Sequence, residues 1–532
     1  MTASPTRPAA TRPTAKGGAR PDPSAERTVL DYVHAVRDRW TRPLSPPGFV
    51  PDWADRPSPH THHPAADRLA LPLHRGELTV SDGAFDLSSL ASFLQLSAGP
   101  VARRWRIDWS PDTDGRESVT GARWGRGTAS GGGAYPVELL WAAGPSAPVP
   151  AGVYHYASGL HALEALRIGD PSPRIRAALD GARDREPRTD QFLLCTVRFW
   201  KTAYKYSDFA YHLMLHDLGA FLGSWDALCQ ETGLESRPRL SFDDAALADA
   251  AGTEPGEGAV LAVLPLPWAT GGDGPYGPGP DCAPVGRARH ERSVRTRRFD
   301  RVAAVHRATS GRARPGTPPS PAPEPARSLV PLPTGPTRRA ALVDAFAVRT
   351  SANGLLNGAR PLPVADLGAV LHEAAGGLRT GEGGPQPTGL RLSVRNVEAV
   401  APGVYDYLPE RHALVPVPGV RYRPLDERVY SLSNYSVGQA AVTLVPNWQP
   451  EHTVRAAGAR AYRRAAVEAG ATCQLLQLAA ARRGLASGVV LGFDGPVLEA
   501  ALGLDREARH GLLCLFLGPP QEGAARLDDR LY

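Results

Sequence analysis

The chain has 532 residues, of which 42% are hydrophobic and 21% charged, with a formal net charge of +6. This length predicts two to four domains, each large enough to bury a core. No run of about 18 apolar residues occurs, which excludes a membrane span, and no nucleic-acid-binding motif accompanies the excess arginine. Five scattered cysteines without a CxxC pair argue against a disulfide framework and a zinc site, and favour a cytoplasmic location.

The N-terminal part is rich in Ala, Pro, Thr and Arg, so residues 1–26 are expected to be a disordered leader rather than a secretory signal. Residues 27–41 carry a short amphipathic pattern, and a proline-rich connector with Asp52-Trp53 and Arg56-Pro57 follows. Helix-like and strand-like patterns then alternate. The expected elements are helices over 87–98 and 174–182 and strands over 137–142, 152–156, 160–168, 190–199 and 258–265.

A long core helix is expected after the strand over 190–199. Its apolar residues recur at three- and four-residue spacing: Tyr211, Met214, Leu215, Leu218, Phe221 and Leu222. Ser207 or Asp208 is the expected N-cap and Gly233 the expected stop. Lys205 and Tyr206 would then lie at the N-terminal mouth of this helix.

Lysine is rare in this chain, which makes Lys205 a candidate for proton transfer. Only Lys16, Lys201 and Lys205 occur among 60 basic residues. Arginine keeps its proton in proteins, whereas a lysine amine can lose it when burial or a neighbouring charge lowers its pKa. Lys205 is therefore a candidate base, and Lys201 fits a lysine whose amine reaches solvent at the surface.

Residues 267–337 are expected to be a linker, because Gly, Pro and Arg dominate and no periodicity is present. A basic island over 287–307 interrupts it. The island contains Arg292-Ser293-Val294-Arg295, which could hold an anion, but its flanking composition favours an exposed basic run.

The sequence repeats itself at a constant offset of 251 residues. Gly152-Val153-Tyr154 recurs as Gly403-Val404-Tyr405, Ala210-Tyr211 as Ala461-Tyr462, and Phe242-Asp243 as Phe493-Asp494. One register over this span indicates a tandem duplication. The expected organisation is an N-terminal half over 27–266, a C-terminal half over 338–520 and a tail over 521–532. The register changes upstream, which places an insertion of about 26 residues in the first half between Gly99 and Arg126.

The two halves differ where chemistry is expected. Lys205 and Tyr206 correspond to Ala456 and Ala457, and Ser130 corresponds to Gly381. The second half instead carries Arg349-Thr350-Ser351, for which the first half has no counterpart. Each half has kept different parts, as expected of a fused dimer with one site built from both halves.

These motifs resemble the SagB/ThcOx-type azoline dehydrogenases of the nitroreductase superfamily. The stretch Arg126 to Leu139, with Ser130-Gly131-Gly132-Gly133, is similar to the family's R…SGGAxYPxEL loop. Gly152 to Tyr156 is similar to its PGxYxY strand, and Tyr204-Lys205-Tyr206 to its Lys-Tyr motif. Arg349-Thr350-Ser351 resembles the superfamily's RxS motif.

The resemblance implies an α+β fold: two fused nitroreductase-like domains, each with a mostly antiparallel sheet flanked by helices, forming an intramolecular pseudo-dimer. It implies FMN between the halves. The implied cofactor residues are Arg126, Ser130, Gly131, Gly132, Gly133, Arg349, Ser351 and Asn353. Asn353 stands where the superfamily often has a second arginine.

The implied function is oxidation of peptide-bound thiazoline or oxazoline rings to azoles in ribosomal peptide natural-product biosynthesis. Lys205 would act as base and Tyr206 would orient it. The implied partners are an azoline-containing precursor peptide and a cyclodehydratase complex. Two alternatives remain open: a broad NAD(P)H-dependent nitro or quinone reductase, and a non-catalytic scaffold that presents peptide to a cyclase.

Overall fold

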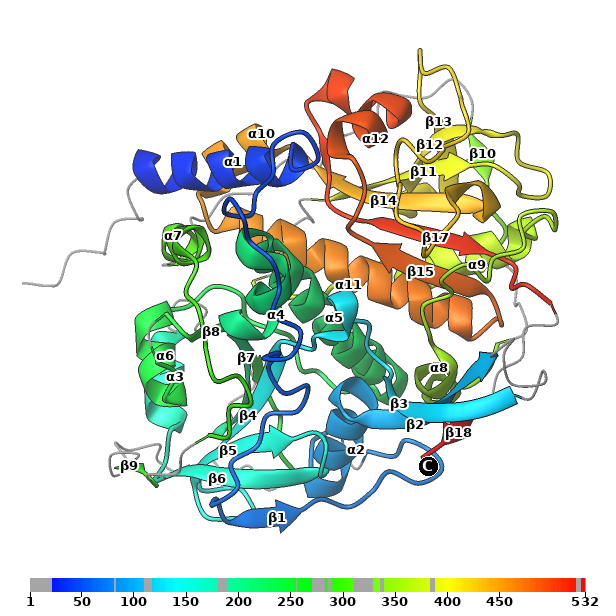
Figure 1. Cartoon of the computed structure of the whole chain (residues 1–532). Helices are drawn as coiled ribbons and strands as arrows, with labels where there is room; N and C mark the ends of the chain where they lie inside the picture. Colours follow the sequence, from blue (N-terminus) through cyan, green and yellow to red (C-terminus); the bar gives the residue numbers. More distant parts are fainter. Residues whose placement is uncertain are drawn as a thin grey trace, which may run out of the picture.

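The computed structural model describes residues 22–80, 83–109, 117–179, 189–254, 256–269, 283–285, 289–310, 329–334, 339–382, 388–522 and 528–531. Most of the expected leader, much of the expected linker with Cys282, and part of the expected tail lie outside these ranges. Two sheets flank a central pair of long helices (Figure 1). Among the described helices, none combines the length and hydropathy that a membrane crossing requires.

The first sheet has the strand order β1-β6-β5-β4-β7-β8, with β9 paired to β6. Its strands are β1 (Arg68–Ala70), β4 (Val137–Ala143), β5 (Gly152–Ala157), β6 (Ala162–Ile168), β7 (Gln191–Arg198), β8 (Gly258–Pro265) and β9 (Ala283–Pro284). All pairings between these strands are antiparallel. Strands β5, β7 and β8 are buried along their whole length, because helices cover both faces of the sheet.

The second sheet repeats this order as β10-β13-β12-β11-β14-β17-β15, with β16 paired to β14. Its strands are β10 (Val330–Pro331), β11 (Gly389–Val394), β12 (Gly403–Leu408), β13 (Ala413–Pro416), β14 (Val442–Trp448), β15 (Ala486–Val490), β16 (His510–Gly511) and β17 (Cys514–Gly518). The shared strand order confirms the two equivalent halves and the expected α+β fold.

Four of the five helices in each half repeat as well; the helix over 172–178 in the first half and the helix over 342–348 in the second have no counterpart among the described residues. The first half contains α2 (Leu87–Ala98), α3 (Ser172–Ala178), α4 (Phe199–Tyr206), α5 (Ala210–Thr232) and α6 (Asp244–Ala251). The second contains α8 (Leu342–Val348), α9 (Val364–Ala374), α10 (Pro450–Ala457), α11 (Ala461–Ala481) and α12 (Gly495–Leu502). Short 3₁₀ turns occur at Gly131–Gly133, Ser207–Phe209, Pro409–Arg411, Val437–Gln439 and Asp505–Glu507. Equivalent aspartates, Asp243 and Asp494, cap α6 and α12.

The two long helices α5 and α11 cross at the centre of the molecule (Figure 1). They approach backbone to backbone at glycines: a Cβ atom on Gly223 would lie 2.8 Å from the Ala471 carbonyl oxygen. The predicted apolar stripe of α5 is buried as expected. His212, His216 and Asp217 are buried too. Helix α11 packs against His212 and His216, and Ser130 and Gly131 bond to Asp217.

The predicted insertion is a β-hairpin, β2 (Pro100–Trp109) and β3 (Glu117–Arg126), which pairs with β18 (Asp528–Arg530) from the C-terminal end. The hairpin reaches the second half. Arg104 donates to the Arg349 carbonyl oxygen at 2.8 Å and to the Thr350 hydroxyl at 3.1 Å. The insertion therefore supports the RxS-like segment of the opposite half.

Two further helices, α1 (Pro23–Arg37) and α7 (Asp300–Thr309), lie side by side (Figure 1). Both carry the pattern Asp-x-Val-x-Ala-Val, at an offset of 269 residues. Helix α1 starts inside the expected leader and α7 inside the expected linker, so both segments contain ordered structure that composition alone obscured.

Each of these two helices contacts the half that it does not directly precede in the chain: α1 contacts the second half and α7 the first. Helix α1 bonds to the second half, with Arg37 on Glu499 at 2.6 Å and His34 on Glu451 at 2.7 Å. Helix α7 packs on the first half, where the His306 ring meets the Phe199 ring edge to face. One hydrophobic cluster runs from Val29 to Leu517 through both halves. The halves therefore share a core.

Candidate active site

The glycine loop after β3 is shaped by a buried aspartate. The Ser130 hydroxyl donates to the Asp217 carboxylate at 2.6 Å, and the Gly131 amide donates to the same group at 2.8 Å. The Ser130 oxygen also accepts from the Tyr135 amide at 2.8 Å. Burial raises the pKa of Asp217 to about 7. The bonds of Ser130 serve the loop itself, which leaves Gly132 and Gly133 as its exposed residues.

The second half holds the same loop from the other side. Gln474 of α11 accepts from the Ala129 amide at 3.1 Å and donates to the Gly127 carbonyl oxygen at 3.0 Å. Arg349 donates to the Gly127 carbonyl at 2.6 Å and to the Arg126 carbonyl at 3.1 Å. The loop is therefore positioned by groups from both halves.

Lys205 and Tyr206 lie against this loop. A Cβ atom on Gly132 would collide with the Tyr206 hydroxyl and would lie 2.9 Å from the Lys205 Nζ atom. The Lys205 amine is 4.7 Å from the centre of the Tyr206 ring and 5.6 Å from that of Trp53. Burial raises the pKa of Tyr430, a residue of the second half, to about 12, and the nearby Tyr206 phenol acts in the same direction. The pair lies where the two halves meet.

The expected N-cap is wrong. Lys205 and Tyr206 form the last turn of α4, not the mouth of the long helix. Ser207 breaks the chain there with a φ of 46°, and its hydroxyl bonds to the Ser45 hydroxyl at 2.6 Å. Helix α5 begins at Ala210 without a side-chain cap.

Lys201 is buried, so its interpretation as a surface lysine is wrong as well. Its Nζ atom lies 3.6 Å from the Glu138 carboxylate, which also accepts a hydrogen bond from Thr61. Burial lowers the pKa of Lys201 to about 8, although Glu138 acts in the opposite direction. Lys201 is one helical turn before Lys205 in α4, and Glu138 is in β4, the strand that follows the glycine loop.

Arg126 is buried and bonded within the first half. Its guanidinium contacts His60 at 3.1 Å and lies 4.1 Å from the centre of the Tyr135 ring. Its side chain therefore contacts the loop at Tyr135, whereas Gly132 is on the exposed part of the loop.

Arg349, Ser351 and Asn353 leave donors for an anion at the junction of the halves. Burial lowers the pKa of Arg349 to about 10, and its Nη1 atom has no hydrogen-bond partner among the described residues. Ser351 and Asn353 are exposed and lie beside Tyr435, and Asn353 has a φ of 45°. A buried guanidinium N–H without a partner is costly, and a phosphate would satisfy it. These residues fit a phosphate-bearing flavin.

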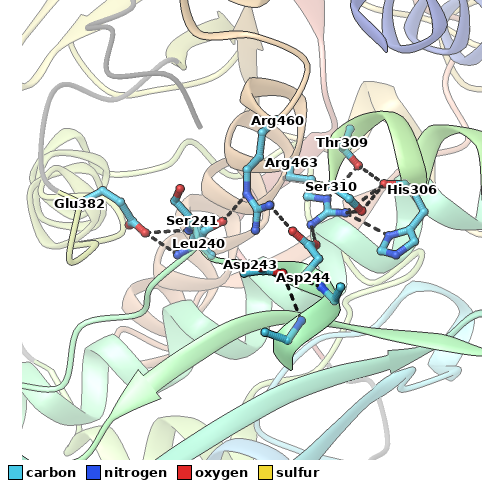
Figure 2. A network of polar contacts seen from close by, with 12 residues as sticks. Leu240, Ser241, Asp243, Asp244, His306, Thr309, Ser310, Glu382, Arg460 and Arg463 are labelled. Atoms are coloured by element: carbon cyan, nitrogen blue, oxygen red, sulfur yellow. Dashed lines mark hydrogen bonds and ion pairs between the residues drawn. The ribbon is translucent and has the colours of Figure 1, made fainter. Parts of the chain in front are cut away.

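The equivalent site of the second half is filled by protein. Glu382, which corresponds to Gly131, accepts from the amides of Leu240 and Ser241 at 2.7 and 2.8 Å (Figure 2). Arg460 donates to the Leu240 carbonyl oxygen at 2.7 Å, and a Cβ atom on Gly381 would collide with Arg239. Among the described residues no such contact covers Gly133, and none has an atom within 4 Å of an added Cβ atom there.

A possible metal-ligand group lies apart from the loop. The ligand atoms of His63, His155 and Glu164 lie within 4.8 Å of one another. Glu164 already accepts from the His63 amide at 2.9 Å and from Arg68 at 3.1 Å, and contacts His155 at 3.1 Å. The carboxylate is thus bound by protein donors.

Asp217 and Gln474 are the residues that sequence reasoning missed. Asp217 carried a signal, because it is an acidic residue within an apolar helix pattern, where an unpaired charge would be costly. Gln474 carried none, since its role depends on where α11 crosses the first half.

Comparison with known proteins identifies relatives of this chain. A model of the nitroreductase family matches residues 382–518. The putative nitroreductase MJ1384 of Methanocaldococcus jannaschii is 32% identical over 153 residues, which are 26% of this chain and 74% of that protein.

Solved structures show the same fold. A putative nitroreductase from Anabaena variabilis superposes with a TM-score of 0.69 at 20% identity, over 93% of this chain and 99% of that one. A chain of the E. coli microcin synthetase McbBCD complex is 22% identical over 38% of this chain and 86% of its own. Its TM-score is 0.28, too low to support an argument about function. The identity and coverage of the M. jannaschii relative show that this chain belongs to the nitroreductase family.

Proposed function

We propose that this chain is an FMN-dependent dehydrogenase that oxidises peptide-bound thiazoline or oxazoline rings to thiazoles or oxazoles. The observation that carries the proposal is the contact of the Lys205 amine and the Tyr206 hydroxyl with Gly132, on the exposed part of the glycine loop. Family membership supports an oxidoreductase, and the motif around Lys205 supports this substrate class. A ribosomally made precursor peptide and a cyclodehydratase complex are the proposed partners.

The reaction removes one proton from ring C4 and one hydride from ring C5. Bound FMN would supply the acceptor for the hydride. The Lys205 amine takes the C4 proton, and the Tyr206 hydroxyl beside it holds the amine in place and passes the proton on. Trp53, whose ring lies 5.6 Å from the amine and is 55% exposed, offers an aromatic surface next to the substrate ring.

The proposed flavin lies between the halves. Gly132 and Gly133 would face its ring, and Ser351, Asn353 and the Nη1 atom of Arg349 would hold its phosphate. Because Glu382 fills the equivalent space of the second half, we expect one FMN per chain. Flavin released by denaturation and quantified by absorbance against protein measures this ratio. A ratio of two would contradict the proposal.

The test of the reaction is Lys205→Ala with a thiazoline-containing peptide, followed by mass spectrometry for the loss of two hydrogens. Loss of a general base typically slows turnover by at least about 10²-fold. We expect this variant to keep its flavin absorbance and lose turnover by that factor. Arg360→Ala, at an exposed ion pair with Glu522, is the matched surface control. Wild-type turnover in Lys205→Ala would reject the assignment.

A broad NAD(P)H-dependent nitro or quinone reductase is the second candidate, favoured by the family relationship itself. Oxidation of NADPH with a nitroaromatic acceptor, at a rate independent of Lys205, would favour it over the azoline reaction. The third alternative is a scaffold that presents peptide to a cyclase, and purified protein without flavin absorbance would favour it.

A further inference from the structure

A cavity of ≈ 880 Å³ lies between the segment 289–310 and the first half. Helix α7 and the stretch before it form one wall. Helix α4, α6 and the beginning of β8 form the other. This volume is in the range of cavities that bind drug-sized ligands or short peptide segments.

One acidic residue of the lining, Asp244, is neutralised by two arginines of the second half. Asp244 is paired with both Arg460 and Arg463, the latter at 2.5 Å (Figure 2). Arg463 also donates to Ser310 at 3.0 Å and contacts His306 at 3.0 Å. Burial and Arg463 lower the pKa of His306 to about 3, so this histidine is neutral. Two guanidinium groups therefore face one carboxylate.

The acidic residues along the walls are also paired. Glu291 lies 2.7 Å from Arg198, and Glu257 lies 3.3 Å from Arg289. Asp300 is in the first turn of α7, where the helix N-terminus stabilises its charge.

Three arginines of the lining remain available. Arg297, Arg298 and Arg307 are exposed, and no ion pair joins them to an acidic group of the described residues. The Arg298 guanidinium lies 3.5 Å from the position of a Cβ atom on Gly256, at the turn before β8. Unpaired guanidinium groups around a cavity favour a ligand with several carboxylates or phosphates.

The cavity and the active site share one helix. Phe199, Trp200 and Ala203 of α4 line the cavity, and Lys205 is in the last turn of the same helix. At about 100° per residue, Lys205 lies on the opposite side of α4 from Phe199 and Ala203, and the helix rises about 9 Å between Phe199 and Lys205. A peptide that occupies the cavity and reaches the amine must therefore pass around the helix, a path of about 18 Å that about five or six extended residues span.

We propose that this arginine-lined cavity binds an Asp- or Glu-rich segment of the peptide substrate, with the ring to be oxidised next to Lys205. The proposal rests on the function proposed above, because it assigns the substrate of that site. A peptide is favoured because the lining combines arginines with the apolar surfaces of Phe199, Trp200 and Val294, the last of which is 90% exposed.

The test is fluorescence anisotropy with a labelled hexaglutamate peptide and a hexaglutamine control. Two double variants of equal charge are compared: R297Q/R298Q, which changes the lining, and R292Q/R295Q, which changes exposed arginines of the same segment outside the lining. We expect affinity for hexaglutamate to fall about tenfold in the first variant, since two exposed charge pairs of up to about 1 kcal/mol each are lost. The second variant should lose less than about twofold, because its arginines lie outside the lining. Hexaglutamine should bind at least tenfold more weakly than hexaglutamate.

Equal losses in both double variants would overturn the proposal, because they would indicate a diffuse basic surface. Displacement of hexaglutamate by a single-stranded oligonucleotide or by NADPH at lower concentration than by unlabelled hexaglutamate would also overturn it, in favour of a phosphate ligand. Peptide binding is measured without turnover. A failure of the proposed oxidation would therefore leave the outcome of the binding test unchanged. With an azoline peptide that carries glutamates, R297Q/R298Q should raise KM about tenfold and leave kcat unchanged.

Discussion

Gly132 and Gly133 form a natural pair for testing the contact between the glycine loop and Lys205. Both have left-handed backbone, with φ of 61° and 67°. Alanine at either position therefore costs a similar strain of about 1–2 kcal/mol. Gly132→Ala adds a methyl group that meets the Tyr206 hydroxyl and the Lys205 amine, whereas an added Cβ atom on Gly133 meets no described residue within 4 Å.

The added methyl group forces the ends of two flexible side chains to move. A shift of about 1 Å in a catalytic group can cost about 10²-fold in rate. We expect Gly132→Ala to reduce azoline oxidation by this factor and Gly133→Ala to reduce it less than fivefold, with similar losses in the free energy of unfolding. Urea titration gives the stability, and mass spectrometry of the peptide gives the rate.

A second readout does not depend on the proposed reaction. Lys205 can be followed by amine acylation and mass spectrometry, with the buried Lys201 as internal reference. Displacement into solvent should accelerate acylation of Lys205 in Gly132→Ala alone. Equal rates of turnover and of acylation in the two variants would refute the inferred contact.

Two further predictions concern stability. Arg349→Met leaves the carbonyl groups of Gly127 and Arg126 without their donor and should lower the free energy of unfolding by about 3 kcal/mol and weaken flavin retention. Arg360→Met should change stability by less than about 0.5 kcal/mol, and equal losses in urea titrations would contradict this role of Arg349. Burial raises the pKa of Glu468 from 4.5 to about 7. The folded state favours the protonated carboxyl group, so stability is lost as the pH rises from the first value to the second. Glu468→Gln should therefore match wild type near pH 4.5 and exceed its stability at pH 8 by up to about 3 kcal/mol, whereas the same difference at both pH values would show that titration of Glu468 is not the cause.

The sequence predicted those features that depend on local pattern or on the repeat. The constant offset of 251 residues predicted two equivalent sheets, because strand order follows from equivalent segments in equivalent sequence. The apolar spacing predicted the long helix up to Gly233, whose φ of 73° explains the stop. The change of register predicted the interval in which the hairpin β2–β3 is inserted.

Features that depend on distant contacts could not be predicted. Helix α7 was missed because its offset of 269 differs from that of the other repeats and proline-rich segments surround it. The position of Lys201 depends on Glu138, which is 63 residues earlier in the chain and meets it only through the packing of β4 on α4. The break at Ser207 depends on Ser45, which no local pattern connects to it.

The filled space around Glu382 has an evolutionary consequence. In a homodimer each substitution is present in both clefts. A residue that stabilises the fold by filling one cleft therefore blocks the other cleft as well, and activity is lost. A covalently joined pair escapes this constraint, because each cleft is encoded separately. One cleft could then be filled by side chains that stabilise the fold: Arg239, Glu382 and Arg460. The other cleft alone remained under selection for catalysis.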